Sequence, residues 1–90
     1  MDAPTYAYSE GLRVFYDGEV LGEAIYSALL AMTEEPLERL KFAHLLQLET
    51  ETKAWLRPYL LAAGESVVES PAIRAQGLDI AQAQDRKSVV

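Results

Sequence analysis

The sequence predicts an all-α protein built on a long antiparallel helical hairpin, with a shorter helix after it. Apolar residues recur at helical spacing through two long segments, and only a very short connection separates these segments. Two long helices joined in this way must fold back on one another. A chain of 90 residues forms one domain at most, so we expect a single helical domain that makes half of a four-helix bundle.

The first helix is predicted over about residues 9–32. Ser9 is a suitable N-cap, and the helix dipole favours Glu10 in the first turn. Three glycines at positions 11, 18 and 22 lower the helix propensity of this first half. Glycine inside a helix can also mark the close approach of a neighbouring element.

The second helix is predicted over about residues 34–63. Thr33 is the expected cap, and Pro36 falls in the first turn, where a missing N–H costs nothing. We expect Pro58 to kink this helix or to end its regular part. Gly64 is a favourable residue for the helix stop.

A linker is expected at residues 64–69, followed by a possible short helix at about residues 71–84. Ser70 followed by Pro71 is a strong start signal, because serine caps the helix and proline suits its first position. The segment is rich in alanine and is interrupted by Gly77.

Composition excludes several classes of function. The chain has no cysteine, which rules out disulfides and thiolate metal sites. Its net charge of −6 argues against binding to nucleic acid or to an anionic membrane surface. The longest uncharged stretch, Ala24–Thr33, is too short to cross a bilayer, and no signal peptide is recognisable, so we expect a cytoplasmic protein. No serine lies in a recognisable catalytic motif.

The first helix has more apolar surface than one partner helix can cover. One side carries Leu12, Phe15, Tyr16 and Leu30, and the other carries Val14, Leu21, Ile25, Leu29 and Met32. A helix that is apolar on two sides belongs inside a larger bundle. A homodimer with four long helices is the simplest solution, and a larger helical partner is the other. A chain shortened from a longer four-helix protein would present the same surface.

Three carboxylates fall where the helical period calls for apolar residues. Glu49 continues an unbroken spacing of three and four residues through the apolar arc of the second helix. Glu19 and Glu23 lie one turn apart along an apolar and aromatic stripe of the first helix. A buried carboxylate is costly unless it is paired, hydrogen-bonded or bound to metal, so we expect partners that neutralise these groups.

Two explanations of the carboxylates stay open at this point. Carboxylates on facing helices are how helical bundles hold paired iron or manganese ions. Alternatively, Glu19 and Glu23 lie at a helix edge, and Glu49 pairs with a tyrosine, lysine or arginine from a neighbour. A lysine or arginine in this space would favour the second explanation. His44, the only histidine, lies at the border of the apolar arc and not beside Glu49.

Gly22-Glu23 in the first helix and Leu48-Glu49-Thr-Glu-Thr52-Lys-Ala-Trp-Leu56 in the second resemble one half of a ferritin-like or rubrerythrin-like protein. The resemblance covers about residues 9–62 and implies a Glu from the first helix and a Glu-x-x-His motif from the second. Glu23 and Glu49 match the two glutamates, but Thr52 stands where the histidine would be. The gap between Glu23 and Glu49 is also shorter than in the family by about two turns. Taking Glu19 as the first ligand reduces this difference.

Two functions follow from these observations. The first is a non-enzymatic, ferritin-like helical module that dimerises or docks on a partner and binds no metal. The second, implied by the resemblance, is an iron- or manganese-binding protein that oxidises or stores iron. Its metal ligands would be Glu23 and Glu49, with Glu19 as a further candidate. Tyr26 would be a hydrogen-bond donor beside the ligands, and Thr52 would take the place of the missing histidine.

Overall fold

The computed structural model describes the backbone of residues 3–89 and the side chains of residues 7–84. It contains three helices, α1 (Ala3–Met32), α2 (Pro36–Ala62) and α3 (Pro71–Val89), and no strand within the described residues. The predicted all-α class is therefore confirmed. None of the helices in this part of the chain combines the length and the apolar character needed to traverse a bilayer.

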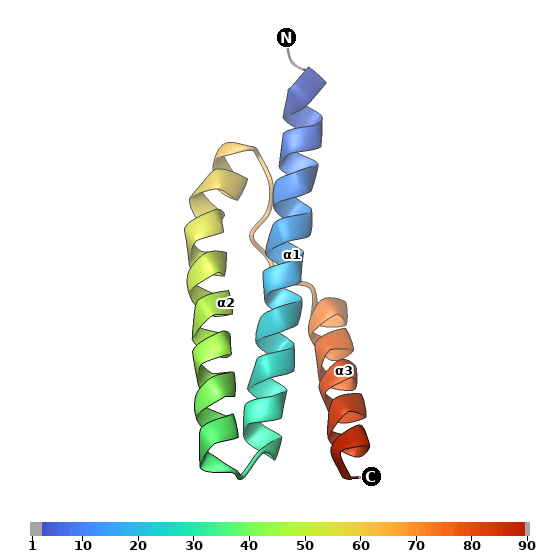
Figure 1. Ribbon diagram of the computed structural model, residues 1–90. Coiled ribbons are helices and arrows are strands. Elements are labelled where there is room, and N and C mark those ends of the chain that lie inside the picture. Colours follow the sequence, from blue (N-terminus) through green and yellow to red (C-terminus); the bar gives the residue numbers. More distant parts are fainter. Residues whose placement is uncertain (1–2, 90) are drawn as a thin grey trace.

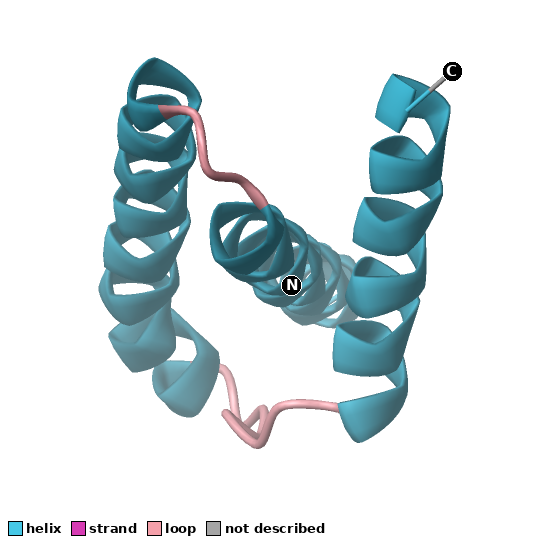
Figure 2. Ribbon diagram, turned by 90° about the horizontal axis from the view of Figure 1, so that it is seen from below, coloured by secondary structure: helices cyan, strands magenta, loops and turns pink. Residues whose placement is uncertain are grey.

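α1 lies in the middle of the molecule, with α2 along one side and α3 along the other (Figures 1 and 2). Both outer helices pack on α1, but in the described part of the chain they do not contact each other. The result is an elongated layer of helices with dimensions of 54 × 21 × 18 Å. The central position of α1 explains why its sequence is apolar on two sides.

α2 returns along α1 after a connection of three residues. Near the start of α2, the ring of Phe42 stacks on Tyr26 in the last third of α1, with 6.4 Å between ring centroids. Near the end of α2, Arg57 Nε donates a hydrogen bond to the Tyr16 hydroxyl, 3.2 Å away, in the first half of α1. Contacts between the two helices therefore extend along most of the length of α2.

Two predicted helix starts are wrong. α1 begins at Ala3, and Ser9, the expected N-cap, is buried inside the helix. The N-cap of α2 is Glu35 and not Thr33. The Glu35 side chain accepts a hydrogen bond from the backbone N–H of Glu38 at 2.8 Å, which satisfies one of the free N–H groups at the helix start.

The predicted stop of the second helix is confirmed. Of the two effects expected of Pro58, a kink or an end of the regular helix, the end does not occur there. α2 continues through Pro58 to Ala62. The carbonyl that loses its partner there belongs to Ala54, which is exposed and so accessible to water. Gly64 has a φ of +80°, and the next N–H, from Glu65, returns to the carbonyl of Leu60 at 2.9 Å. This left-handed position is the usual place for a glycine at a helix end.

α3 starts where the Ser70-Pro71 pair predicted but extends to Val89, past the expected end at residue 84. The Ser70 hydroxyl accepts a weak hydrogen bond from the N–H of Ile73 at 3.4 Å. Gly77 does not interrupt the helix, because it is buried where α3 crosses α1. The side chains after residue 84 lie outside the described residues.

The core is small and lies on the side of the layer that the linker crosses. It contains Tyr16 and Val20 of α1 with Leu56 and Leu60 of α2. Val67 of the linker packs against this group, and Leu12 and Ile73 complete the cluster. The linker therefore closes one face of the helical layer and leaves the opposite face uncovered.

Candidate functional site

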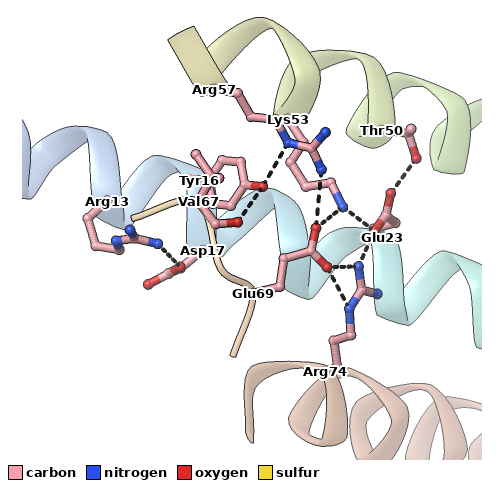
Figure 3. Close-up of polar contacts among 10 residues, drawn as sticks. All are labelled: Arg13, Tyr16, Asp17, Glu23, Thr50, Lys53, Arg57, Val67, Glu69 and Arg74. Carbon is pink, nitrogen blue, oxygen red and sulfur yellow. Dashed lines mark hydrogen bonds and ion pairs between the residues drawn. The ribbon is translucent and has the colours of Figure 1, made fainter. Parts of the chain in front are cut away.

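A cluster of charged side chains joins all three helices and the linker, and we call it the ion network (Figure 3). At its centre, Glu23 of α1 accepts hydrogen bonds from Lys53 Nζ at 2.7 Å and from Arg74 Nη2 at 2.5 Å. The Thr50 hydroxyl donates a third hydrogen bond to Glu23, also at 2.5 Å. Glu23 is thus surrounded by donors from α2 and α3.

Glu69, in the linker, is the second carboxylate of the ion network. It accepts hydrogen bonds from Lys53 and from Arg74, whose Nε lies 2.9 Å away. Arg57 Nη2 is 3.6 Å from the same carboxylate. Lys53 and Arg74 each bridge Glu23 and Glu69, so the four groups form one connected unit that ties the linker and α3 to α1 and α2.

The surroundings keep these groups charged. Burial opposes the ionisation of Glu23, but the hydrogen bonds from Lys53, Thr50 and Arg74 outweigh it and lower the pKa of Glu23 to about 2. Glu69 is also partly buried, and its bonds to Lys53 and Arg74 lower its pKa. Lys53 is only 5% exposed, yet its two carboxylate partners raise its pKa. The network is therefore balanced internally.

A pair of carboxyl groups, Glu19 and Glu49, lies on the other side of the contact between α1 and α2. A Cβ added at Gly22 would lie 1.8 Å from Glu49 Oε2, so this carboxyl rests directly on the glycine. Residues 22 and 23 project about 100° apart on a helix, which separates this pair from the ion network. Burial, then the hydrogen bond and negative charge of Glu49, raise the pKa of Glu19 to about 7. Once protonated, Glu19 donates a hydrogen bond to Glu49.

The three predicted metal ligands are thus divided between two clusters. Glu23 binds two cations, while Glu19 and Glu49 contact each other. Within the described residues, no group of three or more His, Cys, Asp and Glu side chains could hold a metal ion. Tyr26 stacks on Phe42, and Thr52 is half-buried on α2. The donor set of one chain therefore does not fit a carboxylate-bridged metal pair.

Three members of the ion network were not singled out from the sequence. Glu69 and Arg74 lie in segments without a strong pattern, and no sequence spacing connects them with Glu23. Lys53 did carry a recognisable pattern. It precedes the buried Leu56 by three residues and Leu60 by seven, so it lies in the apolar arc of α2, where a cation requires a partner.

The uncovered side of the layer, which we call the open face, is apolar along both long helices. Along α1 it follows a stripe in which spacings of three and four residues alternate: Tyr8, Gly11, Phe15, Gly18, Gly22, Ile25, Leu29 and Met32. Phe15 therefore lies on the side of Ile25 and Leu29, and not on the side of Tyr16 as expected from the sequence. Midway along the stripe, Gly22 is buried beneath the Glu49 carboxyl, which interrupts the apolar surface. Along α2 it includes Leu48, Trp55 and Tyr59. Phe15 is 50% exposed and Trp55 is 60% exposed, although large aromatic side chains are normally mostly buried.

One end of the open face is hollow. Next to the turn between α1 and α2 lies a trough of about 520 Å³, with Leu29, Met32 and Phe42 as its apolar lining. Its other lining residues are polar or charged: Thr33, Glu34, Glu35, Glu38, Lys41 and Gln84. The exposed aromatic side chains Phe15, Trp55 and Tyr59 lie toward the opposite end. The open face therefore has one projecting end and one hollow end.

The two kinds of carboxylate predict a stability maximum at mildly acidic pH. The pKa of Glu19 is raised from 4.5 to about 7, so its stabilising contribution is complete below pH 4.5 and is lost as the pH rises through 7. The pKa of Glu23 is lowered from 4.5 to about 2, so its contribution is present above pH 4.5 and is lost as the pH falls toward 2. We expect the free energy of unfolding to peak near pH 5 and to fall by about 1–3 kcal/mol by pH 8.

Urea denaturation at fixed protein concentration, from pH 4 to 8, measures this profile. Glu19→Gln mimics the protonated side chain and should remove the decline above pH 5. Glu10→Gln, at an exposed position of the same helix, should leave the profile unchanged. A wild-type profile that is flat between pH 5 and 8 would contradict the assigned role of Glu19.

Comparison with known proteins gave no match to a family model, a curated protein or a solved structure. Function is therefore inferred from the geometry of the chain itself. The ion network is internally satisfied, and within the described residues no buried side-chain nitrogen or oxygen lacks a hydrogen-bond partner. The feature that remains to be accounted for is the open face.

Proposed function

We propose that this chain is a non-catalytic helical assembly module that forms a homodimer through its open face. One observation carries the proposal: the three helices form a single layer, and only one face of that layer is covered. Stable domains pack at least two layers of secondary structure around a shared core. A second copy supplies the missing layer.

The surface area of the chain supports a partner of this size. The accessible surface is 6035 Å², whereas a compact folded monomer of 10.0 kDa has about 5200 Å². The excess of roughly 800 Å² equals the area that each partner buries in a standard protein interface. A second copy on the open face would therefore cover about the surface that the fold leaves in excess.

The composition of the open face also suits an interface. Trp55 and Tyr59 lie together on α2, with 5.1 Å between ring centroids, and Phe15 is exposed on α1. Aromatic side chains are enriched in the centres of interfaces, where they contribute most of the binding energy. In a two-fold dimer the same patch serves both copies, so one set of exposed aromatic residues is sufficient.

A dimer of two antiparallel hairpins contains four long helices, which is the arrangement that the ferritin-like resemblance implies. We keep that ancestry as part of the proposal. The alternative function, iron or manganese binding for oxidation or storage, stays a prediction. It is the weaker of the two, because Lys53 and Arg74 already neutralise Glu23.

The test is sedimentation equilibrium of variants that place a charge on the open face. Phe15→Glu combined with Trp55→Glu should weaken the dimer by about 100-fold or more, because two central aromatic contacts are lost. Leu61→Glu is the matched control. Leu61 is 61% exposed on the same helix as Trp55 but lies about 120° around it, so dimerisation should be unchanged. A monomeric wild type, or a double variant that dimerises like the wild type, would contradict the proposal.

A further inference from the structure

We infer that the two copies pair with their α1 helices antiparallel across the two-fold axis, an orientation we call head to tail, so that Phe15 of each chain is seated in the trough of the other. This inference rests on the proposed dimer and adds its orientation and its main contact. It follows from the positions of the projecting end and the hollow end on the same face.

The register of the α1 stripe fits a two-fold axis near its middle. Phe15 precedes Gly22 by seven residues, and Leu29 follows it by seven residues. Seven residues are almost two helical turns, or about 10.5 Å along the axis. A two-fold axis that lies between the two α1 helices, perpendicular to them and level with Gly22, therefore places Phe15 of one copy opposite Leu29 of the other. Each aromatic ring then lies opposite the residue that lines the trough of the partner.

Shape favours this orientation over the parallel one. Phe15 is half exposed, and the trough of about 520 Å³ is lined by Leu29, Met32 and Phe42. Head-to-tail pairing places a projecting apolar group against the three apolar side chains of a trough at both ends of the interface. Parallel pairing would bring Phe15 against Phe15 and one trough against the other. It would leave both hollows without partner atoms, which forfeits packing energy.

Near the middle of the stripe, at Gly18, the two α1 helices can approach closely. Gly18 has no side chain, and no described atom lies within 4 Å of a Cβ placed there. At Gly22 the space above the backbone is filled by the Glu49 carboxyl. That carboxyl bonds to Glu19, whose pKa is raised to about 7, so below this pH Glu19 is neutral and adds no negative charge to the interface. A buffer at pH 6 is therefore the appropriate condition for the test.

The same axis also accounts for the exposed residues of α2. Glu49 is level with Gly22, so the axis passes close to the middle of α2 as well. Trp55 lies six residues beyond Glu49, and Phe42 lies seven residues before it. The two-fold rotation therefore places Trp55 of one copy, together with Phe15, near the trough of the other.

Disulfide cross-linking tests the orientation, because the chain has no native cysteine. A disulfide forms only between residues whose Cα atoms lie within about 7 Å. We expect an oxidised mixture of the single variants Phe15→Cys and Leu29→Cys to give the mixed disulfide as its main product. Val68→Cys is the control for the opposite face, and it should not cross-link to Leu29→Cys.

The outcomes separate this inference from the proposed function. A dimer in which Phe15→Cys cross-links mainly to itself would overturn the head-to-tail orientation but leave the dimer intact. A wild-type chain that stays monomeric would overturn both. Charge pairing is a second measurement that needs no disulfide. Phe15→Glu/Leu29→Lys should self-associate about 10-fold more tightly than Phe15→Glu/Leu29→Glu, because head-to-tail pairing brings position 15 against position 29 and so pairs opposite charges only in the first variant. Equal association would overturn the orientation.

Discussion

Replacing Lys53 with methionine is expected to lower the free energy of unfolding by about 3 kcal/mol, because Glu23 and Glu69 lose their shared buried cation. Lys53 is 5% exposed, so water cannot replace its ammonium group. For a domain of this size, this loss corresponds to a fall in melting temperature of about 10–20 °C. Thermal unfolding followed by circular dichroism, at one protein concentration, measures the change.

Lys41→Met is the matched control for this substitution. Lys41 also pairs with a glutamate, Glu38, at 3.1 Å, but both side chains are about half exposed. Exposed ion pairs contribute little, so the change should stay within about 0.5 kcal/mol. If Lys53→Met proved as harmless as Lys41→Met, the ion network would not be what holds the linker and α3 to α1 and α2.

Gly77→Ala is expected to detach α3 from α1. An added Cβ at position 77 would lie 2.7 Å from Ala24 Cβ and 3.0 Å from the carbonyl oxygen of Leu21. The second of these atoms belongs to the backbone, so the helices must move apart. Overpacking of this kind costs about 1–3 kcal/mol, even though alanine favours the helix itself. Hydrogen exchange should show faster exchange throughout α3, while the amides of α2 stay protected.

Gly11→Ala is the control for helix propensity. Gly11 is exposed, and no described atom lies within 4 Å of a Cβ placed there. This substitution should stabilise the chain by about 0.5–1 kcal/mol. Gly77→Ala is therefore predicted to lower the free energy of unfolding and Gly11→Ala to raise it. A stabilising Gly77→Ala would mean that α3 does not pack closely on α1.

The class of the fold and some of its helix boundaries were predictable, because they depend on local chemistry. Gly64 ends α2 and Pro71 begins α3, as the sequence indicated. The errors arose where tertiary contacts override propensity. From the sequence, Gly77 was expected to interrupt the helix, whereas in the structure it lies where α3 packs closely on α1. Glu35 caps α2, although Thr33 is the better cap by residue type.

The site was predictable only in part. The sequence indicated that the carboxylates of α1 and α2 need partners, and the structure provides partners for all three. Within one chain, the cations bind Glu23, whereas Glu49 pairs with Glu19. Arg74 is separated from Glu23 by 51 residues, and no periodic pattern connects residues in different helices. A long-range pairing of this kind depends on how the helices pack, which one sequence does not specify.

Trp55 offers the most direct test of the central claim, that a second copy covers the open face. It is the only tryptophan of the chain and is 60% exposed in the single copy. Acrylamide quenching of its fluorescence across a dilution series at pH 6 reports whether this face is covered. We predict weak quenching and blue-shifted emission at high concentration, with both reversed on dilution into the monomer. Strong quenching that does not change with concentration, in a sample shown to be dimeric, would contradict the account and place the interface elsewhere.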